Sequence, residues 1–168
     1  MSTAELSDFL SRHQAALEAD EAKHNLILGL LNRARANPGA ARLWSLGGGA
    51  SCAVQTPPHL LALGDLSPDQ CRELAGRVHA LDFAGCVGPG RTADSMVEAL
   101  AENGHAHRLD KRLRIHTLTV EPSFPDCPGR GRQAGPQDTE LYVEWATAFA
   151  HDTDQIQTSP EKFRQDIQ

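Results

Sequence analysis

The segment that most suggests chemistry runs from Cys86 to Thr92, with the sequence CVGPGRT. Its composition predicts a strand that passes through a glycine turn into the start of a helix. Such a junction points free backbone N–H groups and the positive end of the helix dipole outward, where a phosphate or pyrophosphate can bind. The candidate cofactor-binding residues are therefore Gly88, Gly90, Arg91 and Thr92, with Arg91 as the charged donor.

The same segment also has a purely structural interpretation. Glycines allow a strand to turn into a helix, and Thr92 would then serve as the helix cap. The sequence matches neither the GxxxxGK[ST] pattern nor the GxGxxG pattern of established nucleotide-binding loops. We favour the structural interpretation and keep the phosphate site as the alternative.

Histidines after residue 104 raise the possibility of a metal site. His105 and His107 would share one face of a strand, with Asp110 and His116 nearby. No matched pair of ligands at fixed spacing completes a set of the kind that binds zinc. The sequence therefore predicts no metal site.

Nucleophilic and acid–base chemistry have weak support. Cys86 next to the glycine turn is a conceivable nucleophile with a lowered pKa, but a buried small residue at a strand end is the favoured interpretation. No GxSxG elbow is present. Asp94, Glu98 and Glu102 recur at four-residue steps, which is typical of a solvated helix face. No catalytic residue is predicted.

Charge limits the partners of the chain. Over 168 residues the formal net charge is −6 and the isoelectric point is about 5.7. Nonspecific nucleic-acid binding requires a positive surface that displaces counterions, so nucleic acid is not expected as a partner. Hydrophobic residues make up 40% of the chain, which is enough for a globular core.

Features that the sequence lacks indicate the cellular compartment of the protein. The first 24 residues are charged and lack the apolar region of a signal peptide. No apolar run approaches the roughly 18 residues that a membrane helix needs. The four cysteines contain no CxxC pair, so neither a zinc knuckle nor a redox motif is predicted. We expect a cytoplasmic protein that does not interact with membranes.

The elements that would position these residues follow from hydrophobic periodicity and turn signals. The second predicted helix is apolar nearly all round, and we expect it deep in the core. Proline and glycine mark residues 122–136 as a linker. Helices are expected over 4–19, 21–36, 68–79, 92–102 and 138–151, with a short one from Ser159 or Pro160. Strands are expected over 42–46, 50–55, 59–63, 83–87 and 106–121, the last covered on both faces.

Taken in order, these segments resemble the two-domain bacterial N-acetyltransferases of the GNAT superfamily. The resemblance extends from about residue 5 to about residue 151, and the order of loose motifs carries it. The matching segments are the apolar helix with Glu21 and HNLILGLL (24–31), the hairpin ending VQTPP (54–58), GCVGP (85–89), a helix ending at Gly104, the strand 113–118, GRQA (131–134), and the helix with Asp138, Trp145 and Phe149.

The resemblance implies a fold and a function. It implies an α/β (α+β) fold with a mostly antiparallel central sheet flanked by helices, organised as a degenerate GNAT-like domain over 1–121, a linker over 122–136 and the start of a truncated second GNAT domain over 137–168. Acetyl-CoA would bind in the second domain, and the acceptor would be a small-molecule or peptide amine. The chain would then be the non-catalytic half of an acyltransferase, inactive alone.

Residues 130–135, with the sequence RGRQAG, are superficially similar to the acetyl-CoA loop [Q/R]xxGx[G/A]. That loop must leave a strand and open a helix directly. Here it lies between a proline-rich linker and Pro136, so we interpret it as a linker that enters the first strand of the second domain. Acetyl-CoA binding by this chain itself is therefore not expected.

A different class of function remains open. The predicted helix 138–151 carries Leu141, Trp145 and Phe149 at four-residue steps. An isolated strand and helix cannot bury such a face by themselves. The alternative is therefore a standalone binding or dimerisation module in which this helix associates with a second copy.

Overall fold

The computed structural model describes residues 2–81, 83–123, 128–153 and 159–166. It divides into two compact units, residues 1–119 and 120–168, which are described separately. Residues 124–127 of the predicted linker, which include Cys127, lie outside the described residues.

The first unit contains four helices and four strands among its described residues. Most bounds agree with the sequence prediction within two residues, although the strands are shorter than predicted. Their order is α1 (Thr3–Ala19), α2 (Glu21–Ala36), a 3-10 turn (Pro38–Ala40), β1 (Arg42–Ser45), β2 (Cys52–Gln55), β3 (Leu61–Leu63), α3 (Pro68–Val78), β4 (Cys86–Val87) and α4 (Gly90–Glu102).

The four strands form one mixed sheet in the order β1-β2-β3-β4. β1 and β2 form an antiparallel hairpin in which Trp44 faces Ala53. β2 and β3 are also antiparallel, whereas β3 and β4 are parallel, with Leu61 opposite Cys86. The parallel pair requires the crossover connection that α3 supplies.

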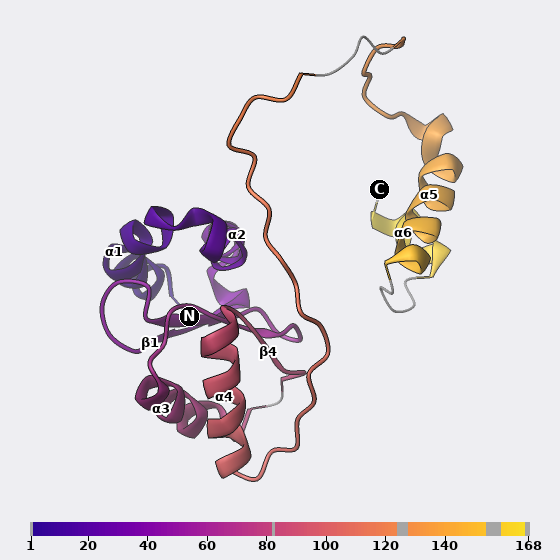
Figure 1. The fold of residues 1–168 in the computed structure, drawn as a ribbon. Coiled ribbons are helices and arrows are strands. Elements are labelled where there is room, and N and C mark those ends of the chain that lie inside the picture. The colour runs from indigo at the N-terminus through magenta and orange to yellow at the C-terminus, as the bar shows by residue number, and fades with distance from the viewer. Residues whose placement is uncertain (1, 82, 124–127, 154–158, 167–168) are drawn as a thin grey trace. The chain divides into compact units, whose positions relative to one another are not determined.

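Helices cover both faces of this sheet (Figure 1). Alternate residues of β2 point to opposite faces, so Cys52 and Val54 belong to one hydrophobic cluster and Ala53 to the other. The first cluster is formed with α1 and α2 through residues such as Phe9 and Leu31. The second is formed with α3 and α4. The unit is therefore a three-layer α/β/α arrangement.

The position of α2 differs from the sequence prediction. Only one face of the helix is buried, with Ile27 and Leu31 each 2% exposed. Leu26 on the opposite face is 45% exposed. The helix forms an outer layer of the fold, so its continuous apolar composition does not correspond to burial on every side.

Residues 106–121 do not form the predicted strand. The described chain has no regular secondary structure here, and its apolar side chains are exposed, from 54% for Ile115 to 77% for Leu113 and Leu118. The alternation in the sequence predicts a strand covered on both faces, but a strand must pair with a neighbour, and no strand of the described sheet pairs with this segment.

The second unit consists of a 3-10 turn (Pro136–Asp138), α5 (Thr139–Asp152) and α6 (Pro160–Asp166). The edge of Tyr142 on α5 meets the ring of Phe163 on α6, with centroids 6.5 Å apart. The predicted first strand at 131–134 is absent. Instead the Arg132 guanidinium binds both oxygens of Asp138 at 2.6 Å, which fastens this segment to the start of α5.

The described elements give an α/β fold with a mixed sheet, as predicted at this level. Two strand pairs are antiparallel and one is parallel. Among the described helices, none is both long and apolar enough to span a membrane.

Candidate functional site

Two strand-to-helix junctions lie together at one edge of the sheet. Because β3 and β4 are parallel and adjacent, the loops that follow Leu63 and Val87 leave from the same edge. In α/β sheets this carboxyl edge is where ligands bind, beside the N-termini of the following helices. The candidate site therefore comprises residues 64–67 before α3 and residues 88–89 before α4. The sequence singled out only the second of these loops.

At the second junction α4 begins at Gly90, two residues before the predicted start. Pro89 is its N-cap and supplies no side-chain hydrogen bond. The expectation that Thr92 caps this helix is therefore wrong. Proline has no hydroxyl or amide side chain with which to bind the first N–H groups, so the start of α4 is left without a side-chain cap.

The four predicted cofactor-binding residues divide into two pairs. Thr92 is 5% exposed, and its Oγ1 accepts a 3.5 Å hydrogen bond from the N–H of Leu66. Gly88 lies against β3, where an added Cβ would be 2.8 Å from the Cβ and O atoms of Leu63. These two residues therefore have packing roles. Gly90 has open space around its Cα, and the Arg91 side chain is exposed.

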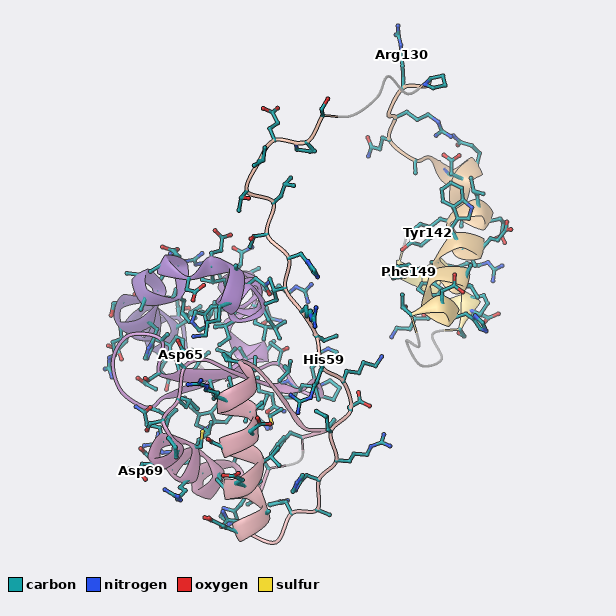
Figure 2. The ribbon with its side chains drawn as sticks, in the orientation of Figure 1. His59, Asp65, Asp69, Arg130, Tyr142 and Phe149 are labelled. Atoms are coloured by element: carbon teal, nitrogen blue, oxygen red, sulfur yellow. The ribbon has the colours of Figure 1, made fainter. Side chains whose placement is uncertain are left out.

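The first junction is closed by its own side chains. Ser67 Oγ accepts from the N–H of Gln70 at 3.2 Å, and Gln70 Oε1 accepts from the N–H of Ser67 at 2.8 Å. This capping box satisfies two backbone donors at the start of α3, and Pro68 has no N–H to offer. Asp69 adds a carboxylate to the first turn (Figure 2). Among the described residues the N–H of Asp69 keeps no hydrogen-bond partner, and the Asp69 carboxylate is paired with Arg72 at 2.6 Å.

Asp65 in the same junction is held by α2. Its carboxylate accepts a hydrogen bond from Lys23 Nζ at 2.7 Å and lies 3.4 Å from His24 Nε2. His24 is 2% exposed, and its Nδ1 is buried without a hydrogen-bond partner. Asp65 thus ties the β3–α3 loop to α2, and its charge is balanced by that of Lys23.

The remaining candidates from the sequence do not assemble into a reactive centre. Burial raises the pKa of the Cys86 thiol, which is opposite to the lowering that an activated nucleophile needs. Asp94, Glu98 and Glu102 are all exposed on α4, as expected for a solvated face. Among the described residues, no group of three or more histidines, cysteines and carboxylates is placed to bind a metal ion.

Arg132, which lies within the loop that is superficially similar to the acetyl-CoA motif, is already paired. Hydrogen bonding and the charge of Asp138 raise the pKa of the Arg132 guanidinium. The same pair, with a 2.8 Å hydrogen bond from the N–H of Gly135 to Asp138 Oδ2, lowers the pKa of Asp138. The guanidinium is therefore engaged within the chain.

Comparisons with known proteins give no assignment. No protein-family model matches the chain. Neither the curated proteins nor the solved structures include a significant match.

Proposed function

We propose that this chain supplies the non-catalytic N-terminal part of an acetyl-CoA-dependent N-acyltransferase and does not itself bind the cofactor. The order of motifs in the sequence supports the resemblance to the two-domain GNAT enzymes, although the strands expected over 113–118 and 131–134 are not formed. In that arrangement the present domain shapes the cleft for an amine substrate, and acetyl-CoA binds to the domain that begins within the second unit.

The absence of an acetyl-CoA loop pattern from both strand-to-helix junctions carries the non-catalytic part of the proposal. An acetyl-CoA loop needs a strand that opens directly into a helix with free N–H groups for the pyrophosphate. The described chain has two such junctions, and neither 64–67 nor 88–91 contains the [Q/R]xxGx[G/A] pattern. At α3 the Ser67–Gln70 capping box also occupies two backbone positions that an anion would otherwise contact.

Calorimetric titration with acetyl-CoA tests the absence of the cofactor site. We expect no measurable binding up to about millimolar concentrations, because neither strand-to-helix junction carries the acetyl-CoA loop pattern. Pyrophosphate alone probes the same backbone donors at the helix starts and serves as the control ligand. A dissociation constant near micromolar for acetyl-CoA would overturn this part of the proposal.

The supporting role is tested with a chimaera. Residues 1–121 replace the N-terminal domain of a two-domain GNAT enzyme whose acceptor amine is known, and acetylation is compared with that of its isolated acetyl-CoA domain. We expect the chimaera to bind acetyl-CoA normally and to acetylate amines faster than the isolated domain. Equal rates would contradict a supporting role.

The exposed stripe on α5 favours a second candidate function, that of a dimerisation module. Trp145 is 67% exposed and Phe149 is 61% exposed, which leaves an apolar face uncovered within the second unit (Figure 2). In this alternative two α5 helices associate through that face. Sedimentation of the chain and its Trp145→Lys variant tests it, because only association through α5 is lost in the variant.

A further inference from the structure

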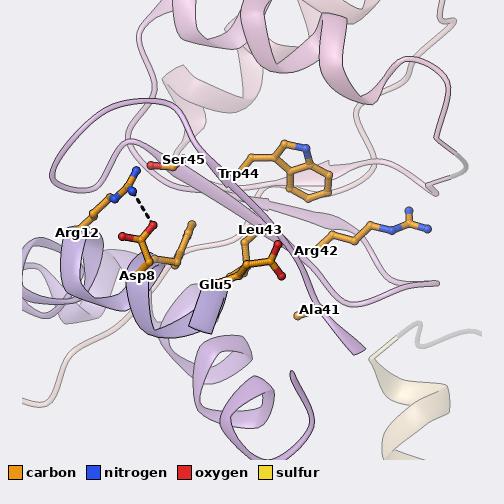
Figure 3. Close-up of a pocket in the computed structure, with 9 residues that line it drawn as sticks. Glu5, Asp8, Arg12, Ala41, Arg42, Leu43, Trp44 and Ser45 are labelled. Atoms are coloured by element: carbon orange, nitrogen blue, oxygen red, sulfur yellow. Dashed lines mark hydrogen bonds and ion pairs between the residues drawn. The ribbon is translucent and has the colours of Figure 1, made fainter. Parts of the chain in front are cut away.

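A groove runs along the outer edge of β1 (Figure 3). One wall is the face of α1 that carries Glu5, Asp8 and Arg12, and the floor is the strand from Ala41 to Ser45. Its volume is about 430 Å³. β1 is the first strand of the sheet, so this groove follows an edge that no other described strand covers.

Backbone hydrogen-bonding groups line this edge. The N–H of Leu46 donates to the carbonyl of Ser51 at 2.9 Å, and residues that pair with β2 alternate along an antiparallel strand. Arg42 and Trp44 therefore direct their backbone groups toward β2, whereas Leu43 and Ser45 direct theirs into the groove. The described chain provides no partner for the N–H groups of Leu43 and Ser45. Such an edge accepts an added strand.

The segment 106–120 has the properties of such a strand. None of its described backbone groups takes part in a backbone hydrogen bond. Leu113 and Ile115 share one side of the extended chain, while Arg112, Arg114 and His116 alternate with them. Leu113 is 77% exposed and Ile115 is 54% exposed.

The charges of the two surfaces bear on the register of the pairing. Residues 105–116 contain four Lys or Arg residues and one Asp. The groove is lined by the carboxylates of Glu5 and Asp8 and by the guanidinium groups of Arg12 and Arg42, so its lining is formally neutral, and Asp8 is paired with Arg12 at the exposed surface. Arginines of an added strand can therefore pair with Glu5 and Asp8 individually, which selects a register.

We propose that residues 109–118 of one copy bind as an additional strand along β1 of a second copy. The segment follows α4, which packs against β4, and β4 and β1 are at opposite edges of the sheet. To reach the groove of its own copy, the segment would have to cross the whole sheet. The groove of a second copy can be reached without such a crossing. Arg112 and Arg114 face Glu5 and Asp8 of the partner copy, and Leu113 and Ile115 face the side of β1 that carries Trp44.

Exchange in both directions gives a closed twofold dimer, in which each copy contributes one strand and one groove. The backbone hydrogen bonds of the added strand provide affinity, and the alternating side chains provide register. This interface does not depend on acetyl-CoA or on the proposed acyltransferase role.

Sedimentation velocity of the full chain over a range of concentrations tests the proposal. We expect a monomer–dimer equilibrium. The Leu113→Asp/Ile115→Asp variant raises the dissociation constant by about a hundredfold, because charged side chains replace the apolar face of the strand. Asp8→Arg and Arg114→Glu each raise it by about tenfold, and their combination restores much of the affinity because the charges are exchanged.

Mixing provides a second test. A copy with Leu113→Asp/Ile115→Asp keeps its groove, and a copy with Asp8→Arg keeps its strand, so the mixture forms dimers with one intact contact. Trp145→Lys is the control and leaves the dimer unchanged. The four altered positions, Asp8, Leu113, Ile115 and Trp145, are exposed, and circular dichroism verifies the fold. A monomer at every concentration, a dimer indifferent to Asp8→Arg, or a dimer lost only in Trp145→Lys overturns the proposal.

Discussion

The imidazole of His13 on α1 and the hydroxyl of Ser45 at the end of β1 are hydrogen-bonded, with 2.7 Å between Nε2 and Oγ. The other ring nitrogen lies 2.7 Å from the carbonyl oxygen of Gly49. His13 is completely buried, and its ring contacts Phe9 with centroids 4.5 Å apart. One side chain thus joins the first helix to the end of β1 and to the turn between β1 and β2.

Replacement of His13 by alanine is expected to destabilise the first unit. The change leaves the Gly49 carbonyl and the Ser45 hydroxyl without their partner and opens a cavity beside Phe9. We expect a loss of about 3 kcal/mol in the free energy of unfolding, measured by urea denaturation. His59→Ala is the control, because His59 is exposed, and it should change stability by less than about 0.5 kcal/mol. Similar values for the two variants would contradict the structural role of His13.

The hydrogen bonds of His13 also predict its tautomer. A carbonyl oxygen only accepts, so Nδ1 must carry the proton that is donated to Gly49. Nε2 then accepts from Ser45, because that contact at 2.7 Å is shorter than the alternative 3.3 Å contact from Ser45 Oγ to the Gly47 carbonyl. A long-range proton–nitrogen correlation spectrum should show a protonated Nδ1 and an unprotonated Nε2. The reverse assignment would show that this hydrogen-bond network is wrong.

Replacement of glycine by alanine is expected to have opposite effects on stability at two positions. A Cβ at Gly64 would be 2.2 Å from the carbonyl oxygen of Ala50, whereas a Cβ at Gly76 in α3 meets nothing within 4 Å. Gly64→Ala should destabilise the fold by about 2–3 kcal/mol, since backbone must move. Gly76→Ala should stabilise it by about 0.5–1 kcal/mol, because alanine loses less backbone entropy in a helix. Thermal unfolding of both variants measures the two changes in stability. Changes in the same direction would contradict this prediction.

The sequence predicted the helices better than the strands, for a physical reason. Helix starts depend on local signals, and Ser67-Pro68-Asp69-Gln70 is a complete capping box within four residues. Strands depend on partners far away in the sequence. Residues 106–121 alternate well enough to predict a strand, but no local pattern can supply the neighbour to which a strand must bind.

The candidate site was predictable only in part. Gly88–Thr92 was recognised as a strand, turn and helix, because these signals are adjacent in the sequence. Its proximity to the β3–α3 junction follows from the parallel pairing of Leu61 with Cys86, which are 25 positions apart. The roles of Asp65 and Gly64 likewise depend on contacts with Lys23 and Ala50 that no short motif encodes.

The capping box at α3 predicts a specific ranking of variants. Ser67→Ala removes the acceptor for the N–H of Gln70 and should cost about 1 kcal/mol of unfolding free energy. Ser67→Asp keeps an acceptor and places a negative charge at the helix start, so its stability should remain near that of the original chain. Chemical denaturation compares the three proteins. Equal losses in the alanine and aspartate variants would mean that the cap contributes nothing.

The last prediction concerns pH and Cys52. Burial raises the pKa of this thiol from its ordinary value near 9 to about 12, with a smaller contribution from the charge of Asp65. Because the folded pKa is the higher one, the protonated thiol favours the folded state. The stabilisation is complete below pH 9 and is lost as the pH rises toward 12, since unfolding then releases a proton.

The Cys52→Ala variant isolates this effect. It lowers stability at every pH by creating a cavity, but it removes the thiol that ionises. Between pH 9 and the folded pKa, the original chain should therefore lose up to about 1.4 kcal/mol per pH unit more than the variant does. Urea denaturation at a series of pH values measures the two slopes. Parallel slopes above pH 9 would show that Cys52 ionises as readily in the folded state as in the unfolded chain.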